Sequence, residues 1–158
     1  DSIVQGSQAA GINLTADDFE PLTWRVKEIG AVQSASTYLR AISTIQQIGR
    51  DMARFHADND LWLTPTLSRP PVPLGYFECS TETAQSALDR IFEFIPFTPI
   101  CNATGQPGMS VPLHWNEEGL PIGTHFTARF GGEATLFRLA AQLEEARPWA
   151  TRRPPVPA

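Results

Sequence analysis

The most regular apolar pattern of the chain lies between residues 34 and 60. Apolar side chains recur there every three or four residues, the spacing of one helix face, at Tyr38, Ile42, Ile45, Ile48, Met52 and Phe55. Ser34 or Ser36 would cap the first turn, and the polar residues at 58–60 would end the helix. The pattern therefore predicts a helix of roughly 30 Å, at about 1.5 Å per residue, whose apolar stripe faces a core.

Three weaker helical patterns accompany this one. A capping-box-like start at residues 15–18 precedes a helix that should reach about Gly30, with Pro21 early enough to bend it rather than abolish it. Ser80 or Thr81 begins another helix, whose apolar face is Ala84, Ala87, Leu88, Ile91 and Phe92. Glu133 opens the last helix, which a proline ends and whose apolar face is Leu136, Leu139, Ala140 and Leu143.

Strand patterns occupy the second half of the chain. Residues 61–64 (L-W-L-T) form a continuous apolar run closed by Pro65, which predicts a strand buried on both faces. Two further apolar strands are joined by a polar turn at 116–119 (N-E-E-G). In the second of them an apolar set, from Ile122 to Phe130, alternates with a more polar set that includes His125, so one of its faces should be wet or lie in a polar site. Strands separated by helices place the chain in the α/β class.

The stretch from Phe94 to Phe130 organises this half. Its first part is rich in Pro, Gly and short polar residues, the composition of a backbone held in specific turns. A fixed loop that feeds a hairpin usually positions something. We divide the single domain into a loop at 1–14, a helical part at 15–60, a sheet core with its closing helix at 61–149, and an exposed Pro- and Arg-rich tail at 150–158.

The composition and charge of the chain exclude several classes of binding partner. The net charge is −5 and the basic residues are scattered, which argues against nucleic acid. No apolar run is long enough to span a bilayer and no signal-peptide pattern opens the chain, so we expect no membrane partner. Cys79 and Cys101 are too few for a disulfide framework and lack metal-ligand spacing, so we expect a cytoplasmic setting, no metal and no cofactor. The first residues, D-S-I, lack an initiator Met, which we interpret as a piece of something longer or as processing.

No convincing reactive group emerges residue by residue. Ser110 lacks the G-x-S-x-G elbow and has strand-like neighbours, so it should point into packing or a neighbouring strand. Lys27, the only lysine, has no serine near it in sequence and is expected on a solvated helix surface. Cys101 has no basic neighbour to activate it and is interpreted as a buried, inert thiol.

The three histidines differ in their expected surroundings. His56 lies near the C-terminal end of a helix, where the helix dipole favours a cation. His114 is close to the hairpin turn and should be solvated. His125 lies on the mixed face of the last strand and is the candidate for lining a pocket. The sequence places no two of them to build a catalytic triad.

Three motifs resemble the amidase signature family in order and spacing: L-W-L-T-P-T at 61–66, F-T-x-x-x-N-x-T-G-Q-P at 97–107, and G-L-P-I-G at 119–123, followed by the closing helix. They match the C-terminal portion of such enzymes, most specifically from Leu61 to Trp149. Within the family they look closest to bacterial amidases similar to 6-aminohexanoate cyclic dimer hydrolase. The resemblance implies an α/β fold with helices on both faces of a mixed sheet, in which the strands at Leu61, Ser110 and Ile122 lie towards the edge.

The resemblance also implies a chemistry. Amidases of this family hydrolyse carboxylic amides with a serine nucleophile, a bridging serine and a lysine base, which lie in a glycine- and serine-rich segment that this sequence does not contain. No catalytic residue is therefore expected in this chain. Its share would be a wall of the substrate pocket, formed by Phe97, Thr98, Cys101, Asn102 and His125. Beside it would lie a structural loop with Thr104, Gly105 and Pro107, in which Gly105 is free to take a positive φ.

Two hypotheses follow. In the first, the chain is the C-terminal part of an amidase, and its partners are the N-terminal portion of the same enzyme and a small-molecule amide substrate, with a homodimer left open. In the second, it is a noncatalytic domain that keeps the fold for scaffolding or ligand binding. Each large apolar side chain left without cover forgoes roughly 1.5–3 kcal/mol of burial, so we expect the isolated chain to aggregate or fold poorly.

Overall fold

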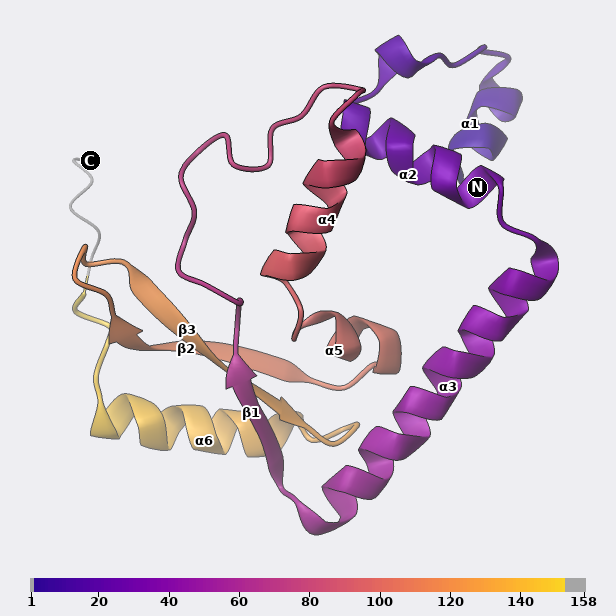
Figure 1. Ribbon diagram of the computed structural model, residues 1–158. Helices are drawn as coiled ribbons and strands as arrows, with labels where there is room; N and C mark the ends of the chain where they lie inside the picture. The colour runs from indigo at the N-terminus through magenta and orange to yellow at the C-terminus, as the bar shows by residue number, and fades with distance from the viewer. Residues whose placement is uncertain (1, 153–158) are drawn as a thin grey trace. The chain divides into compact units, whose positions relative to one another are not determined.

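The computed structural model describes residues 2–152 of the 158-residue chain (Figure 1). Contacts divide the chain into two compact units. The first is made of residues 2–43 and Val72–Phe94, and the second of Thr44–Pro71 and residues 95–152. Each unit is described by itself.

The first unit is helical. It holds α1 (Ser2–Ala10), the short 3-10 helix η1 (Ala16–Asp18), α2 (Pro21–Ala31) and α4 (Ala84–Phe94). α2 packs against α4, where Arg25 Nε donates to Gln85 Oε1 at 3.0 Å. The prediction of a loop at 1–14 is wrong for residues 2–10, because a segment rich in Ala, Ser and Gln has enough helix propensity to form α1 without a strong apolar period.

The predicted capping box is confirmed, but the helix that should follow it is interrupted. The Thr15 backbone N–H donates to Asp18 Oδ2 at 2.7 Å, and this hydrogen bond lowers the pKa of Asp18. The box closes η1 only. Pro21 does not bend a continuous helix; it stands in the first turn of α2, where its missing N–H costs no hydrogen bond.

α4 begins later than the sequence predicts. A turn precedes it, in which the Ser80 backbone N–H donates to Thr83 Oγ1 at 2.9 Å. Of the predicted apolar face, Ala84 and Ala87 are buried. The prediction is wrong for Phe92, which is 62% exposed. The helix ends at Phe94, two residues before Pro96, whose ring disfavours a helical conformation of the residue before it.

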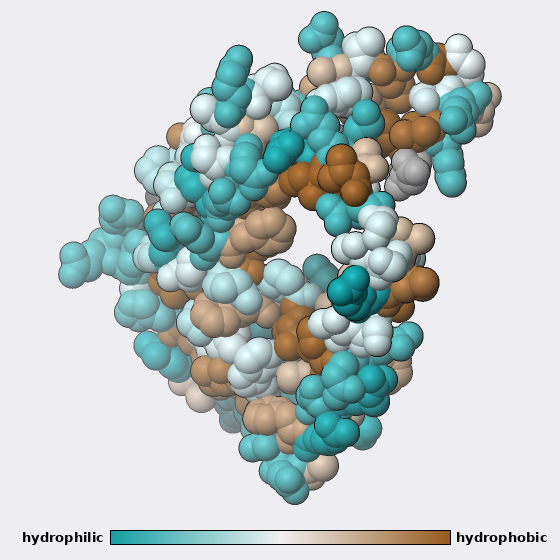
Figure 2. Space-filling model, turned by 45° about the vertical axis from the view of Figure 1, so that its right-hand side comes forward, coloured by the Kyte–Doolittle hydropathy of each residue, from teal (hydrophilic) through white to brown (hydrophobic). Residues whose placement is uncertain are grey.

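α3 (Ala35–Asp58) is the predicted long helix, and it contributes residues to both units. Its 24 residues make it about 36 Å long. The Thr37 backbone N–H donates to the side-chain oxygen of Ser34 at 3.1 Å, so Ser34 is the cap. The predicted burial of its apolar stripe is wrong for Tyr38, which is 64% exposed, and for Phe55, which is 38% exposed. Ile48 and Met52 of the same stripe are half-buried. Apolar side chains also reach the surface in the space-filling view (Figure 2).

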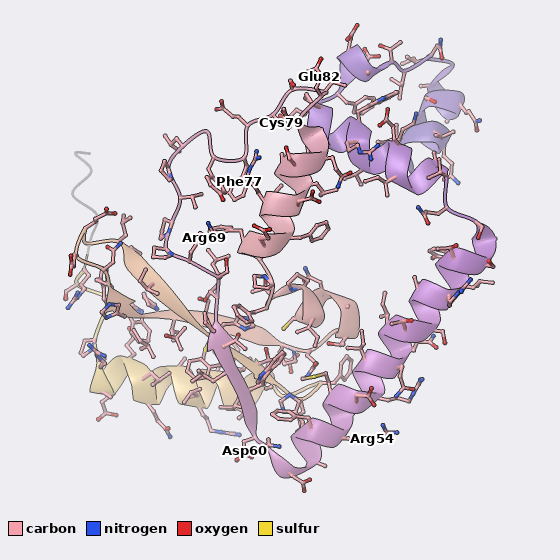
Figure 3. The ribbon with its side chains drawn as sticks, in the orientation of Figure 1. Arg54, Asp60, Arg69, Phe77, Cys79 and Glu82 are labelled. Atoms are coloured by element: carbon pink, nitrogen blue, oxygen red, sulfur yellow. The ribbon has the colours of Figure 1, made fainter. Side chains whose placement is uncertain are left out.

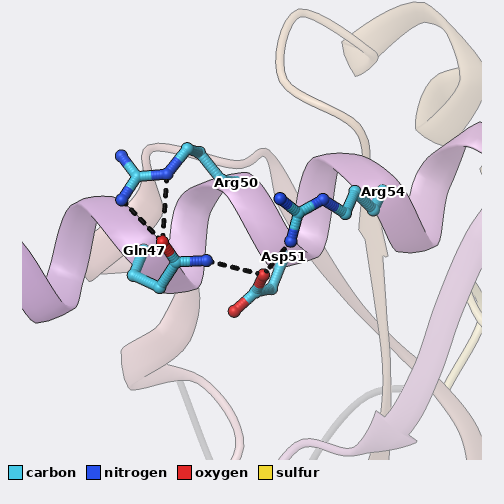
Figure 4. A network of polar contacts seen from close by, with 4 residues as sticks. All are labelled: Gln47, Arg50, Asp51 and Arg54. Carbon is cyan, nitrogen blue, oxygen red and sulfur yellow. Dashed lines mark hydrogen bonds and ion pairs between the residues drawn. The ribbon is translucent and has the colours of Figure 1, made fainter.

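A polar network follows the second-unit part of α3 (Figure 4). Arg50 Nη2 donates to Gln47 Oε1 at 2.7 Å, and Gln47 Nε2 donates to Asp51 Oδ1 at 2.9 Å. Arg54 pairs with the same Asp51 oxygen at 2.7 Å. These partners are three or four residues apart, so they support the helix itself rather than its packing.

The second unit is built on a three-stranded antiparallel sheet with the order β1-β3-β2. Its strands are β1 (Leu61–Pro65), β2 (Gly108–Trp115) and β3 (Pro121–Ala128), and the predicted polar turn joins β2 to β3. β1 pairs with β3 and lies at an edge. The prediction that β1 is buried on both faces is therefore wrong, and Leu63 is 61% exposed.

One face of this sheet packs against α6 (Glu133–Ala146), as Figure 1 shows. The core between them consists of Val111, Phe126, Ala128 and Leu136. Half-buried apolar side chains surround it, among them Leu139 and Leu143 of the predicted α6 face. This is the apolar face of the sheet, and its core contains four of the six buried apolar residues in the described part of the chain.

The other face of the sheet meets α5 (Pro99–Thr104), a short helix that the sequence analysis treated as loop. Pro99 stands in its first turn, and Gly105 ends it with φ 73°, the predicted positive value. The Gly105 backbone N–H donates to the Cys101 carbonyl at 2.9 Å. With α5 on one side and α6 on the other, the predicted arrangement of helices on both faces is confirmed.

The predicted tail is described in part. Residues 150–152 are exposed, and the Arg152 guanidinium lies 4.0 Å from the centre of the Trp115 ring. The rest of the predicted tail, 153–158, lies outside the described residues. Within residues 2–152 no helix has the length and apolarity needed to cross a membrane.

Candidate functional site

The face of the sheet opposite α6 carries polar side chains from all three strands. Pairing places Thr64, His125 and Ser110 opposite one another on β1, β3 and β2. Directly opposed residues of an antiparallel sheet share a face, and alternate residues along a strand do too. We call this side the polar face; its polar side chains are Thr64, Thr66, Ser110, His125 and Thr127, and it also carries Gly108, Gly123, Trp62 and Pro112.

His125 lies at the centre of the polar face. Its side chain is 6% exposed, and its Nδ1 lies 3.5 Å from Thr64 Oγ1, which is a long hydrogen bond. Burial lowers the pKa of His125, because the charged ring loses its water. The ring is therefore neutral at neutral pH, with one nitrogen donating and the other accepting.

Cys101 approaches the same place from α5. Its Sγ lies 3.4 Å from Thr127 Oγ1, and Thr127 is 1% exposed. A Cβ at Gly108 would lie 2.9 Å from His125 Nε2 and 3.3 Å from Cys101 Sγ. The thiol and the imidazole thus face one backbone position that only glycine leaves open. Cys101 is half-buried rather than buried, a small correction to the prediction of a buried thiol.

Ser110 and Thr66 meet across the middle strand. Their hydroxyl oxygens are 2.6 Å apart, and Gly123 lies between them on β3. A Cβ at Gly123 would overlap both hydroxyls, so the contact requires glycine. The prediction that Ser110 points towards a neighbouring strand agrees with this pair. Among the described residues, Ser110 hydrogen-bonds to Thr66 and not to a histidine.

The remaining residues of the predicted pocket wall are only partly brought together. Thr98 precedes α5, and its carbonyl accepts from the Cys101 backbone N–H at 3.1 Å. Phe97 is half-buried, whereas Asn102 is exposed on α5. The geometry therefore joins Cys101 with His125, and it leaves Asn102 outside that pair.

The predicted structural loop ties α5 to the sheet. The Thr104 hydroxyl lies 2.8 Å from the Ile100 carbonyl and 2.9 Å from Gln106 Oε1. Gln106 Nε2 donates to the Ala128 carbonyl at 3.1 Å, and the Ala128 N–H donates to the Pro107 carbonyl at 3.1 Å. The role of Gln106 was not predicted. A glutamine between Gly105 and Pro107 cannot belong to the interior of a helix or strand, so its side chain is available for such a hydrogen bond.

The other candidate residues lie elsewhere. His114 is exposed, as predicted. His56 is buried, and its Nδ1 lies 3.0 Å from the Asn59 carbonyl. Its place near a helix end was predicted, but its burial and its contact with the backbone were not. In the first unit, Lys27 Nζ lies 3.9 Å from the centre of the Trp24 ring instead of being fully solvated. Within residues 2–152 no three His, Cys, Asp or Glu residues gather as metal ligands.

The chain matches a known protein family. A family profile described as Amidase matches residues 10–137, more than half of the chain. The chain belongs to the amidase family. The predicted resemblance is confirmed, and so is the predicted fold class, because solved amidase structures share the fold.

The relatives of this amidase-family chain are much longer than it is. The putative amidase AmiC of Mycobacterium leprae is 42% identical over 111 residues, which cover 70% of this chain and 23% of that protein. The 6-aminohexanoate-cyclic-dimer hydrolase of Paenarthrobacter ureafaciens is 30% identical over 158 residues, 96% of this chain and 32% of that protein. A solved structure of 6-aminohexanoate cyclic dimer hydrolase has a TM-score of 0.85 and 28% identity, and covers 97% of this chain and 33% of that one. The chain thus spans about a quarter to a third of these relatives.

Proposed function

We propose that this chain is the C-terminal part of an amidohydrolase that cleaves carboxylic amide C–N bonds. The observation that carries the proposal is that the chain belongs to the amidase family and covers about a third of a relative named 6-aminohexanoate-cyclic-dimer hydrolase. The serine nucleophile, bridging serine and lysine base of the proposed mechanism lie outside these 158 residues. Its partners are then the N-terminal portion of the same enzyme and a small-molecule amide, and its setting is cytoplasmic.

The side chains of the polar face support a positioning role rather than a catalytic one. A serine nucleophile needs a base within hydrogen-bonding reach, whereas the Ser110 hydroxyl is engaged with Thr66 at 2.6 Å. His125 is neutral and buried, which suits a hydrogen bond to a substrate or to a neighbouring segment. We therefore assign His125 and Cys101 to the wall of the substrate pocket, together with Phe97, Thr98 and Asn102.

Thr104, Gly105 and Pro107 hold this wall in place. Gly105 lets the backbone turn from α5 towards β2, and Pro107 accepts a hydrogen bond from β3. The αL conformation would cost another residue about 1–2 kcal/mol. We also propose that the whole enzyme can form a homodimer. The mass of the native polypeptide under non-denaturing conditions tests this.

The test uses the full polypeptide that contains this chain, as the cell produces it; we call this the native polypeptide. It is isolated with an antibody against residues 35–58, its intact mass is measured, and it is treated with a serine-reactive phosphonate. We expect a mass well above that of this chain and a labelled serine outside residues 1–158. Label on Ser110, or a native polypeptide that hydrolyses no amide, would contradict the proposal.

The second candidate function is a noncatalytic scaffold or ligand-binding domain. It is favoured by the Ser110 hydroxyl, which is engaged with Thr66 rather than with a base. This alternative requires that the native polypeptide bind no phosphonate at any serine. The isolated chain gives a second comparison, because a domain that functions alone should unfold cooperatively. We expect the pure 158-residue chain to aggregate or to lack a cooperative thermal transition, since its α3 stripe is uncovered.

A further inference from the structure

A pocket lies at one end of the polar face, away from Cys101. It has a volume of about 490 Å³ and belongs entirely to the second unit. Its lining includes the hydroxyls of Thr66 and Ser110, which meet beside Gly123. The segment 67–71 that follows β1 lines it too, and Figure 3 labels Arg69 on this segment. Nothing in the proposed function uses this pocket.

The hydroxyl pair leaves one donor for a ligand. Each hydroxyl has a single hydrogen, and the contact between Thr66 and Ser110 consumes one of the two. The other O–H can donate outward, so the pair acts as a hydrogen-bond donor to a group with an acceptor oxygen. Gly123 keeps the two oxygens together, because any Cβ at that position would push them apart.

The charge and polarity of the remaining lining narrow the ligand further. Arg69 contributes a permanent positive charge and Ser68 a third hydroxyl. Among residues 2–152 no acidic side chain lines the pocket, although the whole chain carries a net charge of −5. Much of the rest is apolar, with Leu67, Ile122 and several prolines. Guanidinium and hydroxyl donors suit a carboxylate, and the apolar lining suits a short hydrocarbon chain.

We propose that this pocket binds the carboxylate of a small aliphatic acid. The carboxylate oxygens accept from Arg69 and from the spare O–H of the Thr66–Ser110 pair, and the hydrocarbon chain lies against the prolines and Ile122. The binding itself needs no catalytic activity. If the chain is part of an amidase, such a ligand resembles the acid that amide hydrolysis releases. That identification of the ligand rests on the proposed function, whereas the proposal that the pocket binds a carboxylate does not.

The experiment is an NMR titration of the native polypeptide with pentanoate, observed on the ligand, with pentanamide and 1-pentanol as uncharged analogues. For a ligand as small as pentanoate we expect a Kd on the order of 1 mM. We expect pentanamide and pentanol to bind at least about fivefold more weakly, because they lack the charge that Arg69 recognises. Arg69→Gln should weaken pentanoate by a similar factor and leave pentanamide unchanged, and Arg138→Gln on α6 is the matched control.

The hydroxyl pair gives a sharper test. Thr66→Val or Ser110→Ala alone leaves one hydroxyl with a free hydrogen, so each should weaken pentanoate by no more than about twofold. The double variant has no donor left and should weaken it by about fivefold or more. Thr83→Val combined with Ser86→Ala in the first unit is the control, and protected β3 amides in hydrogen exchange show that each variant is folded.

Three results would overturn the proposal: no pentanoate binding by the folded protein, pentanamide binding as tightly as pentanoate, or a double variant that binds pentanoate like the unmodified protein. None of them depends on amide hydrolysis. Loss of pentanoate binding with intact phosphonate labelling rejects the pocket and keeps the amidase, and the opposite combination rejects the amidase and keeps the pocket.

Discussion

Alternate residues of β3 point to opposite sides of one sheet, and the two sides differ. On the apolar face, Phe126 and Ala128 pack against Leu136 of α6 with ordinary core contacts. On the polar face, His125 and Thr127 are buried to the same degree, at 6% and 1% exposure, yet their partners are a hydroxyl and a thiol at 3.5 and 3.4 Å. These two pairs of β3 side chains are buried alike, but the polar pair has only a long and a weak hydrogen bond.

This difference separates stability from function. Buried apolar side chains stabilise the fold in proportion to the area they remove from water, whereas buried polar groups cost free energy unless they are well bonded. The long hydrogen bond of His125 and the weak thiol hydrogen bond of Thr127 recover little of that cost. A chain keeps such a face when something else, such as a substrate or a neighbouring segment, completes it, which agrees with a pocket wall on this side and a packing surface on the other.

Phe126→Ala should have the largest effect, because it removes the biggest buried side chain of the apolar face. Phe→Ala substitutions in cores cost about 3–5 kcal/mol. We expect this loss in the free energy of unfolding of the native polypeptide, measured by urea unfolding together with hydrogen exchange of the β3 amides. Phe137→Ala is the matched control on α6; Phe137 is 76% exposed, and its loss should stay within about 0.5 kcal/mol. Equal losses for the two variants would mean that the apolar face is not the core.

Gly123→Ala should come next, and it acts from the polar face. The added methyl group overlaps the Thr66 and Ser110 hydroxyls, and overpacking of this kind costs about 1–3 kcal/mol. Gly49→Ala on α3 is the control. It meets nothing within 4 Å, and alanine favours a helix, so it should be neutral or stabilise by up to about 1 kcal/mol. A Gly123→Ala protein as stable as the unmodified one would show that the hydroxyls are free to move apart.

Local pattern predicts much of the fold here. The period of α3, the cap at Ser34 and the polar turn between β2 and β3 are all written in neighbouring residues, and each was predicted. The alternation around His125 also revealed that β3 has a polar face. These features depend on contacts a few residues apart, so a single sequence contains them.

Features that depend on distant partners could not be predicted. Thr66 and Ser110 are 44 residues apart in sequence, and only the register of both strands on β3 brings them together. α5 is too short for a periodic pattern, and Pro99 and Gly105 look like loop residues until one sees them as its two ends. The exposure of the α3 stripe was missed for another reason, since apolar spacing marks a face that should be covered without saying what covers it.

The smallest effect should be a pH dependence that comes from the polar face alone. Burial lowers the pKa of His125 below its ordinary value of 6.5. The unfolded chain therefore takes up a proton on this ring at a pH where the folded protein does not. As the pH falls below about 6.5, the free energy of unfolding should decrease, and this contribution should level off once the folded ring is protonated too.

His125→Gln removes the titrating ring, so its free energy of unfolding should vary less between pH 7.5 and pH 5 than that of the unmodified protein. The measurement is a series of urea unfolding curves of the native polypeptide across that range, at constant ionic strength. His114→Gln is the matched control, because His114 is exposed on β2 and its loss should leave the slope unchanged. The apolar face carries no titratable group among its buried residues, so Phe126→Ala should lower every point of the series by a similar amount. If His125→Gln keeps the full slope, the ring is solvated in solution, and the polar face is then no more buried than an ordinary surface.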